Sequence, residues 1–268
     1  MDRSIMIKNA SNKNMLSIAA ESLVGQHTIP QTILLHLLPG ALITIAFILL
    51  GPWLKHNHLP PLLAFLIPIL LILIPLELGL ILYLGVRRNG RLSLEGIVLN
   101  REPLSLKDYI ILAPALLFWS ILVFMSLGGF DLAILKSLFG WLPDWFQINQ
   151  FTPANYGQPV LIVTFVLFLV LNGFAGPVVE ELYFRGYLLP RIEYLKGWAP
   201  LVNVLLFSLY HFFSPWQNIT RILAFLPWAY AVRWKKNIYL SMVAHWLLNT
   251  GYCLLTAQLF FKYVFALR

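Results

Sequence analysis

Two adjacent glutamates, Glu180 and Glu181, stand inside an otherwise apolar stretch and are the residues best placed to do chemistry. A charged side chain at the centre of a bilayer costs about 2.5–3.5 kcal/mol on insertion scales, so such a pair needs partners or protons. Glu181 precedes Arg185 by four residues, which puts both on one helix face in the order that favours an ion pair. Glu180 points about 100° away on the same helix and is free for another partner.

The two histidines of the C-terminal half, His211 and His245, also lie in apolar stretches. His211 closes the sequence Phe207-Ser-Leu-Tyr-His, and His245 opens the sequence His-Trp-Leu-Leu-Asn249. The second spacing places an imidazole and a carboxamide on one helix face. Each of these residues alone is as easily a packing residue or a bond to a neighbouring helix. Together with the glutamates, they form a set that suits hydrolysis.

Activation of water is the chemistry that these residue types favour. A glutamate in a dry pocket can act as a general base while a histidine holds the water, which are the roles we expect for Glu180 and His211. Amide hydrolysis also needs donors for the oxyanion of the tetrahedral intermediate, and the N–H groups of His245 and Asn249 can supply them. No serine or cysteine stands in a recognisable nucleophile setting, so a covalent mechanism is disfavoured.

The composition is that of an all-α polytopic membrane protein. Of 268 residues, 59% are hydrophobic and 11% are charged, whereas soluble domains carry about 25% charged residues. Several apolar runs reach the roughly 20 residues that cross a bilayer as a helix. Seven transmembrane helices are predicted, or eight. The seven cover roughly residues 31–51, 60–86, 109–128, 159–192, 198–213, 219–233 and 238–264.

Loop charges predict how the helices are oriented. The net charge of +8 comes from short basic loops, which indicate topology rather than binding to nucleic acid. The basic loops follow the second, fourth and sixth spans, and the opposite loops hold only Lys55, Lys136 and Arg221. The positive-inside rule therefore predicts a cytoplasmic N-terminus, with no signal peptide. With seven spans the C-terminus is outside, and an eighth span would reverse this.

One membrane domain with three regions is the simplest organisation. We expect a cytoplasmic N-terminal segment over residues 1–30, a variable transmembrane region over 31–158 and a catalytic transmembrane core over 159–264. The longest stretch outside the spans, from Phe130 to Gln158, carries tryptophans beside charged residues and is predicted to lie on the outer membrane surface. Cys253 is the only cysteine, which excludes a disulfide framework and a thiolate metal cage.

The three motifs together resemble the CPBP family of intramembrane proteases, which comprises the CAAX-prenyl endopeptidases and the bacteriocin-processing or immunity-associated ABI group. The family signatures are Glu-Glu-x-x-x-Arg, Phe-x-x-x-His and His-x-x-x-Asn on three membrane helices. This chain has Glu180-Glu181-Leu-Tyr-Phe-Arg185, Phe207-Ser-Leu-Tyr-His211 and His245-Trp-Leu-Leu-Asn249, so the resemblance covers roughly residues 172–252.

The resemblance implies an endopeptidase that cuts a membrane-associated peptide, either a prenylated tail or a leader peptide. Glu180 and His211 would activate water, and His245 and Asn249 would bind the oxyanion. Glu181, Arg185 and Phe207 would support this geometry. The expected partners are membrane lipid and a peptide or protein substrate, without nucleic acid. The substrate and the oligomeric state stay open.

A metal ion and a different function are the open alternatives. The family is often labelled metalloprotease, and Glu180, His211 and His245 could supply the three ligands of a catalytic zinc. The His-Glu-x-x-His pattern of zinc proteases is absent, so we favour a site that requires no cofactor. Other functions would be a non-catalytic scaffold, a bacteriocin-immunity protein or a small-molecule transporter. Glu77, inside the second span, has no evident partner in the sequence.

Overall fold

The structure is a computed structural model that describes residues 25–147 and 155–266. Most of the predicted cytoplasmic segment 1–30, and part of the predicted surface stretch, therefore lie outside the described residues. In chain order the described elements are α2 (Ile29–His56), α3 (Leu62–Pro68), η1 (Ile69–Leu78), α4 (Gly79–Asn89), α5 (Leu106–Leu138), η2 (Asp144–Phe146), α6 (Gln158–Leu167), η5 (Phe168–Ala175), α7 (Gly176–Glu180), η6 (Glu181–Leu188), η7 (Leu189–Trp198), α8 (Ala199–Tyr210), η8 (Pro215–Gln217), α9 (Asn218–Lys235) and α10 (Ile238–Ala266).

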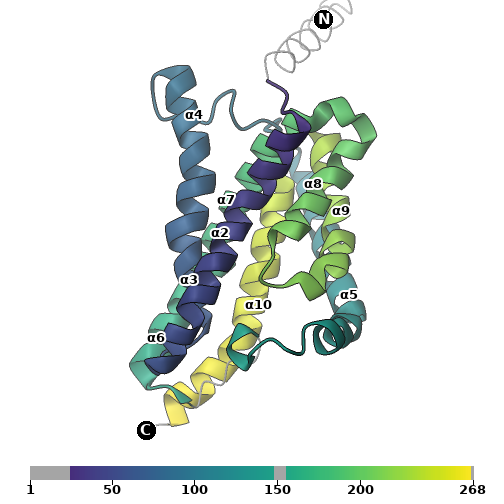
Figure 1. The fold of residues 1–268 in the computed structure, drawn as a ribbon. Coiled ribbons are helices and arrows are strands. Elements are labelled where there is room, and N and C mark those ends of the chain that lie inside the picture. Colours follow the sequence, from purple (N-terminus) through teal and green to yellow (C-terminus); the bar gives the residue numbers. More distant parts are fainter. Residues whose placement is uncertain (1–24, 148–154, 267–268) are drawn as a thin grey trace, which may run out of the picture.

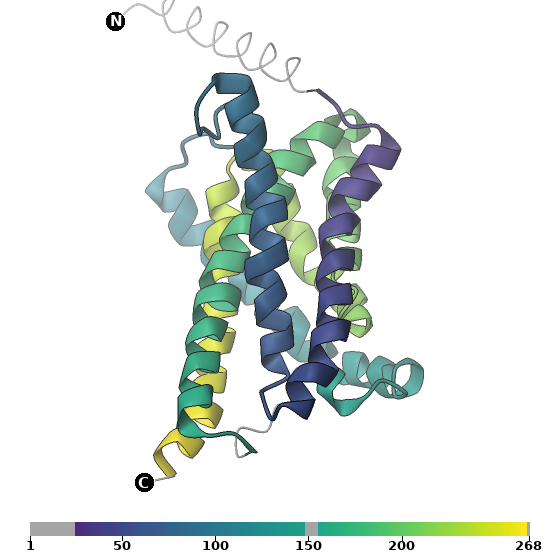
Figure 2. The ribbon, with the colours of Figure 1, turned by 60° about the vertical axis from the view of Figure 1, so that its left-hand side comes forward.

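Long apolar helices run the length of the molecule (Figures 1 and 2). Within the described part of the chain, five helical runs are long and apolar enough to cross a membrane: Ile29–His56, Leu62–Asn89, Leu106–Leu138, Gln158–Tyr210 and Ile238–Gln258. The all-α membrane architecture is thus confirmed. The exact number of spans, seven or eight, stays a prediction.

The N-terminal helices begin and end at clear local signals. Thr28 caps α2, because its hydroxyl accepts from the amide of Gln31 and the side chain of Gln31 accepts from the amide of Thr28. The next rod runs continuously through α3, η1 and α4. Pro75 lacks an amide donor, and the surrounding η1 has wide π-helical turns. The rod ends at Gly90, whose φ of 68° suits a glycine.

Helix α5 is longer than the sequence predicts, since it continues to Leu138 rather than ending near residue 128. Asp131 explains the difference. Its carboxylate is buried within the protein and accepts a hydrogen bond from the hydroxyl of Thr220 at 2.6 Å, so this charge does not force the helix to stop. The predicted surface stretch therefore begins after α5, where Trp141 is exposed and Phe146 is buried.

One rod, formed by α6, η5, α7 and η6, carries both glutamates. It ends in η7, where Ile192 (φ −118°, ψ 19°) and Lys196 (φ 52°, ψ −123°) leave the helical region. The chain turns there, so the apolar run Gln158–Tyr210 consists of two helical bodies. The second body, α8, is 12 residues long, which corresponds to roughly 18 Å.

Helices α8 and α9 form a hairpin that packs beside α2 and α5 (Figure 1). Helix α8 ends at Tyr210, and η8 leads into α9, which is 18 residues long. Neither helix by itself is among the five membrane-crossing runs. Gly40 of α2 permits the close approach, because a Cβ atom there would collide with the backbone carbonyl of Tyr210. The tip of this hairpin therefore lies inside the helical bundle.

Candidate active site

Glu181 is completely buried and fully paired. One oxygen accepts from the hydroxyl of Ser241 at 2.6 Å, and the other lies 3.0 Å from Nδ1 of His245. The guanidinium of Arg185 lies 3.6 Å away, as the four-residue spacing predicts. Both of its oxygens are thus engaged, and Glu181 does not line the cavity, so neither oxygen is presented to a substrate or to water there. Its environment is that of a structural anion.

Arg185 joins two of the sequence motifs. Its guanidinium carbon lies 4.0 Å from the centre of the Phe207 ring, a cation–π contact, and its side chain is fully buried. Among the described residues, its nitrogens make no hydrogen bond, so its charge is balanced by Glu181 and by the aromatic ring. This stacking gives Phe207 a direct role in holding the buried ion pair.

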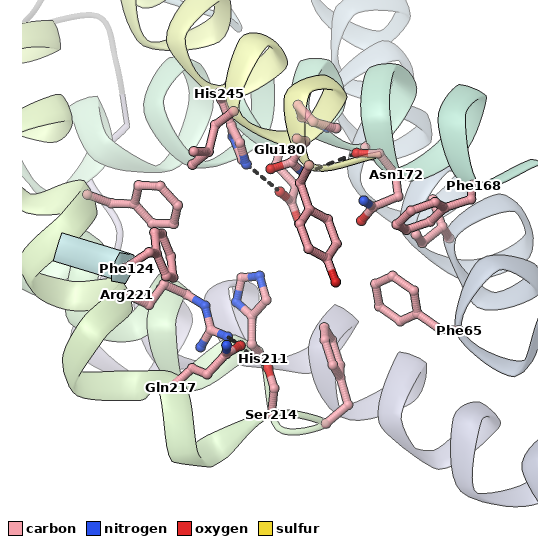
Figure 3. A pocket seen from close by; sticks show the side chains of 18 of the residues that line it. Phe65, Phe124, Phe168, Asn172, Glu180, His211, Ser214, Gln217, Arg221 and His245 are labelled. Carbon is pink, nitrogen blue, oxygen red and sulfur yellow. Dashed lines mark hydrogen bonds and ion pairs between the residues drawn. The ribbon is translucent and has the colours of Figure 1, made fainter. Parts of the chain in front are cut away.

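Glu180 has the opposite environment, although it is the next residue in the chain. It makes no hydrogen bond within the described residues, and its carboxylate faces a cavity of about 790 Å³. Nε2 of His245 lies 3.8 Å from one of its oxygens. Figure 3 shows Glu180 and His245 facing each other at the edge of the open space. Glu180 is therefore the carboxylate whose oxygens can meet water or substrate.

His211 lies at the end of α8, at the tip of the hairpin, and also lines the cavity. Its Nδ1 is 2.8 Å from the carbonyl oxygen of Phe207, so Nδ1 carries the proton and donates it. The other nitrogen, Nε2, then holds a lone pair and can accept a proton from water. Glu180 and His211 point into the same space from different elements (Figure 3). The structure thus brings this predicted pair to one cavity.

Pro177 exposes backbone carbonyls just before the two glutamates. It has no amide, so one carbonyl about a turn earlier lacks its donor within the helix, and in this stretch the hydroxyl of Thr250 donates to the carbonyl of Gly173 at 2.9 Å. The side chain of Asn249 donates in the same way to the carbonyl of Asn172 at 3.0 Å. One hydrogen of the Asn249 amide is thereby engaged, and one remains for a ligand. These bonds fix α10 against the rod that carries the glutamates.

The sequence patterns do not single out the cavity residue Asn172, and they assign the cavity residue Arg221 to a loop. Asn172 lines the cavity beside Asn249, and the available signal was an amide in the same apolar run as the glutamates. Arg221 was counted with the loop charges, but it is 5% exposed and lines the cavity from α9. The loop interpretation was wrong because the helix hairpin ends inside the bundle rather than at its surface.

Arg221 braces the turn that presents His211. One of its terminal nitrogens donates to the hydroxyl of Ser214 at 2.7 Å, and the other donates to the side chain of Asn218 at 3.1 Å and to the carbonyl of Ser208 at 3.3 Å. These partners lie on both sides of the turn, so the guanidinium ties its two ends together. Placing a cation at the end of α8 also complements the helix dipole.

Glu77 lies beside the candidate site rather than in contact with lipid. It is fully buried, and it interacts with Glu180 and with the hydroxyl of Tyr210. Helix η1, which carries it, packs on α7. The isolated Glu77 of the sequence is therefore a third carboxylate near the two glutamates of the motif.

The proposed zinc ligands do not form a ligand set. In the part of the chain that the structure describes, no three His, Cys, Asp or Glu side chains converge so that they could hold a metal ion. Nδ1 of His245 is engaged with Glu181, and its Nε2 faces Glu180, whereas His211 approaches from another element. Among the described residues these three side chains are therefore not gathered as a three-ligand group, and a site without a cofactor stays a prediction.

An all-helical membrane protein with a buried glutamate and histidine cavity is the class that the fold and the site define. Residues 162–251 match the family model described as Type II CAAX prenyl endopeptidase Rce1-like. This match confirms the predicted resemblance to the CPBP and CAAX proteases for about a third of the chain, including all three motifs. No curated protein and no solved structure matches the chain significantly.

Proposed function

We propose that this protein is an intramembrane endopeptidase in which Glu180 and His211 activate a water molecule. The observation that carries the proposal is the contrast between two adjacent glutamates. Glu181 is fully buried with partners on both oxygens, whereas Glu180 faces the cavity without a hydrogen bond among the described residues. A reactive carboxylate needs a free oxygen and rigid surroundings. Glu180 has the free oxygen, and Glu181 helps to hold the surrounding side chains in place.

The reaction begins with removal of a proton from water by the Glu180 carboxylate, while Nε2 of His211 accepts a hydrogen bond from the same water. The oxygen of the water attacks the peptide carbonyl carbon, and the carbonyl oxygen becomes an oxyanion. The C–N bond then breaks, and the proton held by Glu180 passes to the leaving nitrogen. One water is consumed, and one carboxylic acid and one amine are formed.

His245 and Asn249 are the proposed oxyanion donors. Asn249 retains one amide hydrogen after donating to the backbone of Asn172. His245 is oriented by Glu181 through Nδ1, its Nε2 lies on the side of Glu180, and the proposed role requires the form of the ring that carries a hydrogen on both nitrogens. Removing one oxyanion donor typically reduces kcat by about 10²–10³. Glu181, Arg185 and Phe207 position these groups without touching the substrate.

The substrate we propose is a membrane-associated peptide. The cavity wall is mostly apolar, and polar side chains that include His211 and His245 line it together with Glu180. A prenylated tail and a leader peptide with an apolar segment both suit such a wall. The polar groups would then meet the scissile bond, and the apolar wall would bind the flanking residues or the lipid.

Two substitutions test the proposal. Glu180→Gln and His211→Ala should each lower cleavage of a membrane-anchored reporter peptide by about 10²–10⁴, the usual contribution of general acid–base catalysis. The matched control is Glu193→Gln, which changes a partly exposed glutamate that pairs with Arg233 outside the cavity. If both cavity variants retain full cleavage, the proposed mechanism is wrong.

No metal ion is proposed for the chemical step, because the candidate ligands do not converge among the described residues. Metal analysis of the purified protein, combined with cleavage assays after chelation, tests this point. Stoichiometric zinc together with complete loss of cleavage on chelation would overturn the metal-free mechanism.

A further inference from the structure

The cavity occupies one half of the membrane bundle. On α5, which starts at Leu106, the lining residues run from Leu117 to Leu135. On α10, which starts at Ile238, they run from His245 to Thr256. Both helices start at the same end of the bundle, since Tyr109 near the start of α5 donates to Asn237. The cavity therefore begins at about the depth of Glu180 and extends away from that end.

A segment of the loop before α5 seals the end of the bundle above the glutamates. We call residues 97–102 the cover segment. The amide of Leu99 donates to the carbonyl of Gly186 at 2.8 Å, and the side chain of Asn100 donates to the carbonyl of Arg185 at 3.2 Å. Val98 packs so closely on Gly186 that a side chain there would collide with it. None of these residues lines the cavity.

The cover segment is bonded equally firmly to the start of α10. The amide of Ile238 donates to the carbonyl of Asn100 at 2.7 Å, and the amide of Glu102 donates to the carbonyl of Lys236 at 2.9 Å. Backbone hydrogen bonds thus connect the cover segment to both helical rods of the candidate site at this end of the bundle. Because no residue of the cover segment lines the cavity, these bonds indicate that the cavity does not open at that end.

The sealed end is also the basic end. It carries these basic residues: Arg87, Arg88, Arg91, Arg101, Lys107, Arg191, Lys196, Arg233, Lys235 and Lys236. The opposite end, at the close of α2, α5 and α10, carries Lys55, Lys136 and Lys262 among the described residues. The positive-inside rule assigns the basic end to the cytoplasm.

Among residues 25–147 and 155–266, the opposite half of the cavity is bordered by exposed side chains. Met125 of α5 and Leu255 of α10 line it and are 79% and 78% exposed, so the wall between these helices is open toward lipid. The half-buried side chains of Gln147 and Gln217 also line it, near η2 and at the hairpin tip. An apolar side wall with polar groups beyond it suits a peptide that is anchored in the outer leaflet.

We propose that the cavity opens on the extracytoplasmic side of the membrane, and that its substrate is a membrane-anchored peptide whose scissile bond approaches from the outer leaflet. The statement about the substrate rests on the proposed peptidase function, whereas the statement about the opening does not. A peptide tail presented in the cytoplasm would meet the sealed end instead.

Single-cysteine labelling tests the direction of the opening. The background is Cys253→Ser, which removes the only cysteine. Gln217→Cys and Gln147→Cys report on the cavity, Arg91→Cys on the sealed end and Ser137→Cys on the opposite end. A membrane-impermeant maleimide is applied to intact cells and, separately, to inside-out vesicles.

In intact cells we expect labelling of both cavity cysteines and of the cysteine at position 137, without labelling at position 91. Inside-out vesicles should give the reverse pattern. Labelling of the two cavity cysteines only from the side that labels position 91 overturns the proposal, as does labelling of neither cavity cysteine from either side. Labelling of position 91 in intact cells also overturns it, because the sealed end would then be outside.

A pair of reporter substrates separates this proposal from the proposed function. The same anchored peptide is presented once outside and once in the cytoplasm, and only the outer version should be cut. The expected labelling pattern with cleavage of neither version would refute the peptidase function and leave the direction of the opening intact. Cleavage of only the cytoplasmic version would overturn the assignment of the substrate.

Discussion

The pair Glu180 and Glu181 offers a direct test, because one isosteric change can be made at two adjacent positions. Glu181→Gln removes the negative charge that faces Arg185 at 3.6 Å in a fully buried setting. Breaking a buried ion pair by removing one partner costs about 3–5 kcal/mol, because the other charge stays behind without compensation. Glu180→Gln removes a carboxylate that makes no hydrogen bond among the described residues, so its cost should stay under about 1 kcal/mol.

These free energies translate into different unfolding temperatures. One kcal/mol shifts Tm by about 2–4 °C for chains of roughly this size, so Glu181→Gln should lower Tm by roughly 6–20 °C. Glu180→Gln should change Tm by less than about 4 °C while abolishing cleavage. The assay is thermal unfolding of the purified protein in one detergent, followed through the tryptophan signal.

A double variant checks the assigned cause. When Arg185→Met accompanies Glu181→Gln, the unpaired cation is removed, and the double variant should be more stable than the sum of the two single effects predicts. A coupling of about 0.5–3 kcal/mol is typical of residues in direct contact. Equal destabilisation by Glu180→Gln and Glu181→Gln would refute the division between a reactive and a structural glutamate.

Two further predictions concern helix contact and pH. Gly40→Ala should lower the free energy of unfolding by about 1–3 kcal/mol, because the added Cβ would collide with the Tyr210 carbonyl. The control Gly79→Ala adds a Cβ in open space and should not lower Tm. Equal Tm values for the two variants would contradict this packing. Partial burial, together with nearby Arg191, lowers the pKa of His27 from 6.5 to about 4. Stability should therefore fall as pH decreases from 6.5 toward 4, and His27→Gln should flatten that part of a Tm-against-pH profile; an unchanged slope would contradict the assignment.

Much of the site was predictable because its residues obey simple spacing rules. Glu181 and Arg185 form the ion pair that a four-residue spacing predicts. The placement of polar groups in apolar helices is costly, so each one points to a partner or a function. These rules identify the residues of the motifs, but they do not predict which side chain lies next to Glu180. His245 contacts both glutamates, and this depends on how α10 packs.

The parts that escaped prediction depend on contacts between distant segments. Arg221 has the sequence context of a loop charge, and its burial follows only from the hairpin tip lying within the bundle. Asp131 has the sequence context of a helix end, yet Thr220 from another helix satisfies it. Hydropathy measures the preference of a segment for lipid and carries no information on which polar groups meet across helices.

The cover segment connects the candidate active site to a loop outside the family match. Residues 97–102 lie in the region whose sequence carries none of the three motifs, yet they bond to Gly186 and to Ile238 on two rods of the site. The family match starts only at residue 162, so a protein fragment that begins there would lack the cover segment. Transplanting the three motifs into another scaffold thus requires a matching loop, and sequence changes at Val98 and Gly186 are expected to be correlated in evolution.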